Sequence, residues 1–296
     1  MAMASNRLTS ALLPDEPMLG VKLGIVARVC LPDWTADGVL ACPAVPTRAI
    51  TMRSMALSLG DPPETTRRHV NLLRDRGVFT LSAQGVSLAA TADNLALVER
   101  YYLGVHDLLL RLIEDVHATC DIDLTVGTAP QFTIGDVIGR SLDILLMPID
   151  TYRPVGSSLL AFLLWGALTV VAVRTVTHDP VLARRYANEI PPDELRIGTS
   201  LRELAAALSI PYATAWRQVH ALQAENMVTR LAGNRWTVLT RNLLSDSVRE
   251  ISAPPSLLLL RKIRELAQLG LDPARAAAHY RQGRPPLADL GAPRVA

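Results

Sequence analysis

The sequence predicts a mainly α-helical protein with small β-hairpins, organised as two domains related by internal duplication. Three observations support this fold class. The segment 51–81 recurs without a gap at 200–230, a shift of 149 residues. Apolar residues follow helical spacing through most of the chain, and in each copy two short apolar runs flank turn residues. This period indicates a duplicated domain, because the units of solenoid proteins are about 20–50 residues long.

Nine positions are identical in the two copies, and most conservative replacements fall at positions with core-type spacing. Such replacements are Met55/Leu204, Val78/Met227 and Phe79/Val228. The identical pairs are Arg53/Arg202, Ala56/Ala205, Leu59/Leu208, Pro62/Pro211, Thr65/Thr214, Arg68/Arg217, Val70/Val219, Leu73/Leu222 and Thr80/Thr229.

Length and composition fit two folded domains. The chain has 296 residues, of which 49% are hydrophobic and 20% charged, which excludes a disordered protein. The net charge of +2 is weak support for nucleic-acid binding unless the arginines gather on one face. Cys30, Cys42 and Cys120 have no CxxC spacing, so neither a disulfide framework nor a zinc site is expected.

No enzyme motif is found in the chain. It has no Gly-rich phosphate loop, zinc motif or nucleophile motif, so we expect no catalytic residue and no cofactor. His117, Cys120, Asp121 and Asp123 are close in sequence, but their spacing fits the polar end of a helix better than a metal site. The N-terminus has no basic region followed by an apolar run, so a cytoplasmic protein is expected.

One uncharged segment, 154–173, has the length of a membrane span and is flanked by Arg153 and Arg174. Its dense apolar part, Leu159–Val173, suits a buried helix better. A span here would also place the two similar domains on opposite sides of a membrane. The sequence therefore favours a buried scaffold or dimerisation helix, and membrane association is not expected.

The first domain is assigned to 18–117, after a flexible arm at 1–17. A helix at Met18–Cys30 and a Pro-containing linker lead to a helix at Thr51–Leu59. Gly60 is suited to a tight turn; Asp61 and Glu64 are expected to cap a second helix that ends at Gly77. A hairpin then joins 78–81 to 86–88, and a long helical pattern follows at 91–116.

A connector at 118–157, with one helix at about 136–147, leads to the second domain at 158–280. This domain repeats the plan, with an apolar helix at 158–176, a short helix at Ala183–Asn188 and a helix capped by Ser200 and Glu203. The second helix of the pair follows the turn at 209–211. The hairpin strands are 227–231 and 235–239, with Gly233 and Asn234 at the tip, and 281–296 is predicted to be a disordered tail.

A helix, a turn, a second helix and a hairpin make up a winged helix-turn-helix, whose second helix enters a DNA groove. Here these recognition helices are Pro62–Val78 and Pro211–Met227. The segment TTRRHVNLLRDRGVF resembles the recognition helix and following strand of GntR-type bacterial regulators. The segment SLRELAAALSIPYATAWRQVHAL is similar to the equivalent part of IclR- and MarR-type regulators. His69 departs from the aliphatic residue that these families usually bury, and no separate effector domain is visible.

Short or forked polar side chains on the outer face of each second helix are the candidates for reading DNA, since Arg bridges guanine and Asn bridges adenine in a bidentate way. Thr at a helix start suits a phosphate contact. For Trp216, packing on a sugar or thymine methyl and folding back on the domain are equally compatible with the sequence. The second hairpin adds two arginines, whereas the first carries no charge from 78 to 88. The predicted DNA-binding residues are Thr65, Arg67, Arg68, Asn71, Thr214, Trp216, Arg217, His220, Arg230 and Arg235.

The sequence favours a sequence-specific, double-stranded DNA-binding transcriptional regulator that uses two recognition helices from one chain. A replication initiator of tandem winged-helix type and a protein-interaction scaffold remain alternatives. The two halves are expected to pack as an internal pseudo-dimer, with a homodimer as the rival arrangement. In the pseudo-dimer, the apolar helix around Leu159–Val173 is expected to pack on Met18–Cys30 and on the helices that follow each hairpin.

Overall fold

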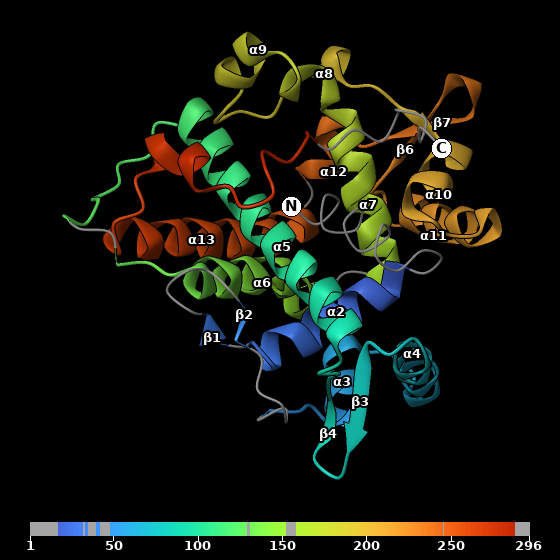
Figure 1. The fold of residues 1–296 in the computed structure, drawn as a ribbon. Helices are drawn as coiled ribbons and strands as arrows, with labels where there is room; N and C mark the ends of the chain where they lie inside the picture. Colours follow the sequence, from blue (N-terminus) through green and yellow to red (C-terminus); the bar gives the residue numbers. More distant parts are fainter. Residues whose placement is uncertain are drawn as a thin grey trace.

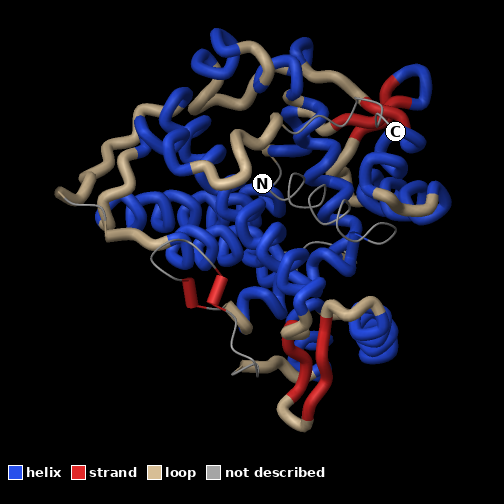
Figure 2. The backbone as a smooth tube through the Cα atoms, viewed as in Figure 1, coloured by secondary structure: helices blue, strands red, loops and turns tan. Residues whose placement is uncertain are grey.

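The computed structural model describes residues 17–31, 33–34, 40–41, 48–128, 131–151, 158–244 and 246–287. Residues 1–16 of the predicted arm and 288–296 of the predicted tail lie outside these ranges. Within them the protein is mainly helical, as predicted, with small antiparallel sheets of two or three strands (Figures 1 and 2).

The N-terminal half ends with a long helix, and a further helix lies in the segment predicted as a connector. The elements are α2 (Pro17–Val29), β1 (Asp33–Trp34), β2 (Leu40–Ala41), α3 (Met52–Leu59), α4 (Pro63–Asp75), β3 (Phe79–Ser82), β4 (Gly85–Leu88), α5 (Ala92–Thr119) and α6 (Ile134–Thr151).

The C-terminal half begins with the apolar helix and ends with a second long helix and a 3₁₀ segment. The elements are α7 (Leu159–Ala172), α8 (Arg174–Thr177), α9 (Pro180–Arg185), η1 (Asp193–Leu195), β5 (Thr199–Ser200), α10 (Leu201–Leu208), α11 (Tyr212–Ala224), β6 (Thr229–Leu231), η2 (Ala232–Asn234), β7 (Arg235–Thr237), α12 (Thr240–Leu243), α13 (Asp246–Gln268) and η3 (Pro273–His279).

Helices α3 and α4 with strands β3 and β4 form what we call the first motif. The hydroxyl of Thr51 accepts a hydrogen bond from Ser54 N and caps α3, while Gly60 ends it with a φ of 65°. Gly77 follows α4 with a φ of 73° before β3 begins. Ile50 pairs with Val86, so a third strand position flanks the hairpin, which the sequence did not indicate.

Asp61 does not cap α4, and this corrects the sequence-based prediction. Helix α4 begins at Pro63, and its N-cap Pro62 has no side chain that could accept a hydrogen bond. The Asp61 carboxylate instead lies 2.5 Å from Nζ of Lys22 on α2, whose side chain is fully buried. A buried ammonium needs a paired anion, so Asp61 joins α2 to the turn between α3 and α4.

Helices α10 and α11 with β6 and β7, the second motif, have the same backbone plan. Ser209 and Asn226 stand 149 residues after Gly60 and Gly77, and they too have left-handed backbones, with φ of 54° and 58°. In β5, Thr199 pairs with Trp236 as Ile50 pairs with Val86. Because non-glycine residues rarely adopt this conformation, the recurrence reflects the geometry of the motif rather than residue identity.

Other local predictions for the second half are confirmed or shifted. Ser200 and Glu203 form the predicted capping box of α10. The hydrogen bonds from Ser200 and Thr199 outweigh the effect of burial and hold the pKa of Glu203 below its usual value. The short helix expected at 183–188 is displaced to α9, because Asp179 caps it through hydrogen bonds from Val181 N and Leu182 N.

The helices pack around three apolar clusters. The first cluster lies under the first motif and includes residues of α2, α5 and α6. The second lies under the second motif and is built largely on α7. Helix α7 therefore packs on α11, α10 and β7 of its own half, which corrects the expectation that α2 and the long helices would cover it. Leu159 at its start also touches the first cluster.

The third cluster joins the two halves. It contains Leu109 and Ile113 of α5, Val137 and Ile144 of α6, and residues of α13 and η3. Figure 1 shows α5 crossing α6 and α13 near the centre of the molecule. The two halves are therefore in contact, and the segment predicted as a connector supplies the central helix.

The start of the predicted disordered tail is docked on α5, which corrects that prediction for 281–287. The backbone N–H groups of Arg281 and Gln282 donate to the buried carboxylate of Asp107. Arg284 and Tyr280 both donate to Glu114. Burial raises the pKa of Glu114, but these hydrogen bonds outweigh it and leave the pKa below its usual value.

The buried ion pair yields a stability prediction. Lys22→Met should lower the free energy of unfolding by about 3 kcal/mol, the lower end of the range for breaking a buried pair, because Asp61 keeps some solvent contact. Urea denaturation measures the change. The double variant Lys22→Met/Asp61→Ile should regain most of this loss, since Ile210 occupies the equivalent place in the second motif. A double variant no more stable than Lys22→Met would contradict the pairing of Lys22 with Asp61 as the source of the loss.

The docking of η3 should depend on pH through His279, whose ring stacks edge-on against Phe132. Burial, then the charges of His106 and Arg281, lower the pKa of His279. In the unfolded chain His279 has a pKa of about 6.5. Between the lower pKa of the folded protein and this value, the unfolded chain binds more protons, so acidification favours unfolding. The contribution of neutral His279 to the free energy of unfolding should be complete above about pH 6.5 and should disappear as the pH falls through the pKa of His279 in the folded protein.

Thermal unfolding from pH 8 to pH 5 tests this dependence. The difference in melting temperature between the wild type and His279→Phe should change with pH, because other titrating groups cancel in the comparison. A constant difference over the whole range would show that His279 does not titrate with folding.

Candidate nucleic-acid interface

Helix α4 has a buried face and an outward face, and the predicted site residues lie on the second. Arg67 and Arg68 are exposed, and Thr65 and Asn71 are half-buried. The opposite face buries Thr66, His69, Val70 and Leu73. The predicted residues of the first motif therefore share one accessible face of one helix.

Helix α11 presents its residues in the same way. From 62 to 74 and from 211 to 223, the degree of burial agrees at every pair of positions except His69 and Gln218. Thr214 and His220 are half-buried, and Trp216 and Arg217 are exposed. In the view of Figure 1 both helices lie at the right of the molecule, α4 below α11.

The arginines of α4 have neighbours on the same helix. Arg67 donates to Glu64 over 2.6 Å at the exposed surface, and this hydrogen bond together with the charge of Glu64 raises the pKa of Arg67. Nη2 of Arg68 lies 3.0 Å from Nε2 of His69. Since a guanidinium only donates, Nε2 is the acceptor, and the buried His69 orients Arg68 rather than merely filling the core.

The Trp216 ring packs against a side chain of its own helix, and part of the ring stays accessible. Its ring stacks on His220 with centroids 4.0 Å apart, and His220 meets the buried Trp236 of β7 edge-on at 5.1 Å. The Trp216 side chain is nevertheless 47% exposed. Trp216 and His220 thus connect α11 to the hairpin while keeping an aromatic surface open.

The two arginines of the second hairpin are held differently. Arg230 donates to Asn234 across the hairpin tip, where both are exposed. Arg235 donates through Nε and Nη2 to the carbonyl of Gly198, which precedes β5. Arg235 therefore connects the outer strand to the hairpin, in addition to placing a charge beside the tip.

Two asparagines that sequence reasoning missed anchor the motifs. Nδ2 of Asn94 on α5 donates to the carbonyl of Val78 at 3.2 Å and also to that of Ala89. Asn242 on α12 donates to the carbonyl of Asn226, just after α11. Both side chains are buried. The two asparagines are 148 residues apart, whereas the longer second hairpin shifts the register of the two segments to 150, so an alignment of the sequence with itself does not pair them.

Comparison with known proteins gives no match: no protein-family model, no curated protein and no solved structure matches the chain. Among the side chains that the structure describes, no three His, Cys, Asp or Glu groups gather as metal ligands would. None of the helices in the described ranges combines the length and apolar character needed to cross a bilayer.

The bond from Arg235 to Gly198 predicts a structural role for this arginine. Arg235→Met should lower the free energy of unfolding by about 1–3 kcal/mol, because the Gly198 carbonyl loses a charged donor. Arg230→Met is the matched control and should change it by less than about 0.5 kcal/mol, as is usual for an exposed side chain. Urea denaturation of both variants measures this, and equal losses would contradict the specific role of Arg235.

Proposed function

We propose that the protein is a transcriptional regulator that binds a specific double-stranded DNA site through two winged helix-turn-helix motifs, related by internal duplication. The recognition helices are α4 and α11. The hairpins β3–β4 and β6–β7 are the wings. The proposal applies to the whole chain, because the helices that follow the two motifs, α5 and α13, share the third apolar cluster.

The observation that carries the proposal is the matched presentation of Thr65 and Arg68 with Thr214 and Arg217. Each pair is identical in residue type and 149 residues apart, and the burial also matches, since both threonines are half-buried and both arginines are exposed. The left-handed residues on either side of each helix recur at the same shift. Packing does not require Arg at an exposed position, so its recurrence there favours a shared contact with a ligand.

DNA is the ligand that suits these side chains. Arg68 and Arg217 can each form two hydrogen bonds to the O6 and N7 atoms of guanine in a major groove. Thr65 and Thr214 lie in the first turn of their helices, where backbone N–H groups also favour a phosphate. The helix start would then fix the register and the arginine would read a base.

The two motifs would read different sequences. Helix α4 adds Arg67 and Asn71, of which Asn suits adenine, whereas α11 adds the stacked Trp216 and His220. Arg230, which donates to Asn234 at the second wing tip, would contact a minor groove or an adjacent phosphate, and the first wing has no equivalent charge. A single chain would therefore favour an asymmetric site over a perfect palindrome.

Selection of bound genomic fragments followed by gel-shift titration tests the proposal. Arg68→Ala and Arg217→Ala should each weaken specific binding by about 1–3 kcal/mol, as the loss of a base contact does. Arg275→Ala is the matched control, since Arg275 is exposed on η3 and pairs only weakly with Asp272 at 3.9 Å. Its affinity should equal that of the wild type.

The double variant and the positions of the bound fragments complete the test. Binding by Arg68→Ala/Arg217→Ala that equals wild-type binding would overturn the assignment of α4 and α11. Fragments that map to promoters support regulation, whereas fragments confined to origin repeats would replace it with replication initiation.

A further inference from the structure

A charged cavity of about 720 Å³ opens between α2, α6 and α13, away from α4 and α11. Its size is within the range of small-molecule sites. One wall is a polar stripe of α6 made by Asp136, Arg140 and Asp143, with Gly135 and Gly139 leaving room between them. The facing walls carry Arg28 of α2, Arg48 before α3, and Lys262 and Glu265 of α13.

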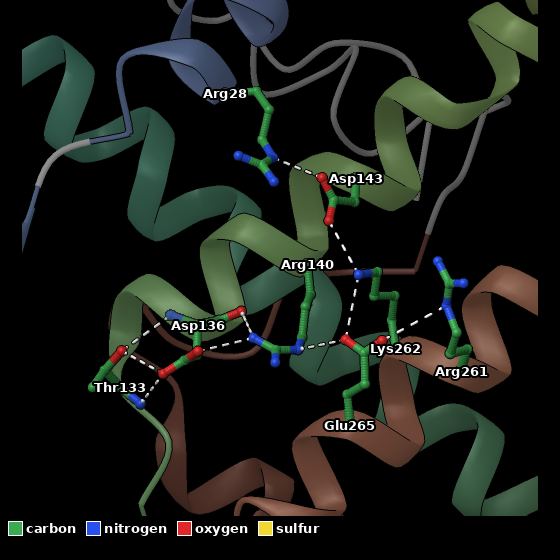
Figure 3. A network of polar contacts seen from close by, with 8 residues as sticks. All are labelled: Arg28, Thr133, Asp136, Arg140, Asp143, Arg261, Lys262 and Glu265. Carbon is green, nitrogen blue, oxygen red and sulfur yellow. Dashed lines mark hydrogen bonds and ion pairs between the residues drawn. The ribbon is translucent and has the colours of Figure 1, made fainter. Parts of the chain in front are cut away.

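The ion pairs of the cavity form one continuous network (Figure 3). Asp143 accepts from Arg28 over 2.6 Å and lies 3.3 Å from Nζ of Lys262. Glu265 joins Lys262 to Arg140, at 3.3 Å and 3.2 Å. The network therefore connects the helix that precedes the first motif, the central helix and the helix that follows the second motif.

The cavity has more positive than negative charge. Its lining contains the four cations Arg28, Arg48, Arg140 and Lys262 and the three carboxylates Asp136, Asp143 and Glu265, an excess of one positive charge. Arg261 adjoins it and pairs with Glu265 at 3.6 Å. Among the described residues, Arg48 forms no ion pair, so its guanidinium is available to an incoming anion.

This lining suits an anion that also carries hydroxyl groups. Guanidinium groups bind phosphate through paired, charge-assisted hydrogen bonds. Each carboxylate has more acceptor sites than its ion pairs use, so Asp143 and Glu265 can accept hydrogen bonds from hydroxyls. The excess positive charge would repel a purely cationic ligand, and an apolar ligand could form no hydrogen bond with this charged lining.

We propose that this cavity binds a sugar phosphate or nucleotide, with the phosphate monoester held by Arg48 and Arg28 and sugar hydroxyls held by Asp143 and Glu265. Binding of this ligand does not depend on the proposed DNA-binding function. Its consequence does, because α2 packs on α4 and α13 follows the second motif, so a ligand that bridges them fixes how the two motifs are placed. The ligand is then an effector of DNA binding.

Isothermal titration calorimetry on the full chain, without DNA, tests the site. The probes are ribose 5-phosphate and AMP, with ribose and inorganic phosphate as comparisons. At least one phosphorylated probe should bind, and more tightly than either comparison compound. Arg48→Gln should weaken that binding by about tenfold to a hundredfold, as loss of a charge-assisted hydrogen bond predicts. Arg264→Gln, an exposed arginine of α13 outside the cavity, should bind like wild type.

The outcomes separate the site from the proposed function. Failure of both phosphorylated probes to bind, equal binding by Arg48→Gln, or binding of inorganic phosphate as tight as that of the probes would each overturn the ligand site. Thermal unfolding of Arg48→Gln in buffer should match wild type, which excludes loss of folding as the cause. A probe that binds but leaves the affinity for DNA unchanged overturns the effector role alone. If the protein does not bind DNA, the calorimetric titrations still test the ligand site, because they contain no DNA.

Discussion

The relative placement of the two motifs depends on the burial of α6 between elements of both halves. Ile138 and Leu142 of this helix belong to the cluster under the first motif, and Val137 and Ile144 belong to the cluster shared with α13. A helix that is apolar on these two sides cannot leave either without exposing apolar surface. Its remaining side carries Asp136, Arg140 and Asp143, which the cavity network satisfies.

The two motifs share their backbone conformation and differ at their outer surfaces. The common part is the backbone, with left-handed residues at 60 and 209 and at 77 and 226, and a buried Asn after each hairpin. The particular part is the outer surface, with Arg67 and Asn71 in one motif and the Trp216–His220 stack in the other. The two motifs therefore share one backbone plan and differ in the side chains that they expose.

Much of the fold and the location of the candidate site were predictable because their causes are local. The spacing of Met55, Ala56 and Leu59 and the capping box of Ser200 act within a few residues, and the structure has helices there. The prediction for Asp61 was wrong because a carboxylate that can cap a helix can equally pair with a distant cation. Lys22, 39 residues earlier, takes it, and no local pattern records that choice.

By itself, the sequence determined the paired helices and the hairpin of each motif and the outward position of the candidate residues on α4 and α11, since periodicity and turn residues encode them over short ranges. Only the tertiary structure decided that α6 is central, that α7 packs on its own half and that 281–287 docks on α5. It also brought Arg28, Asp143 and Lys262 together from three segments. The physical reason is that these contacts join residues far apart in the chain, whose pairing depends on which apolar faces bury one another.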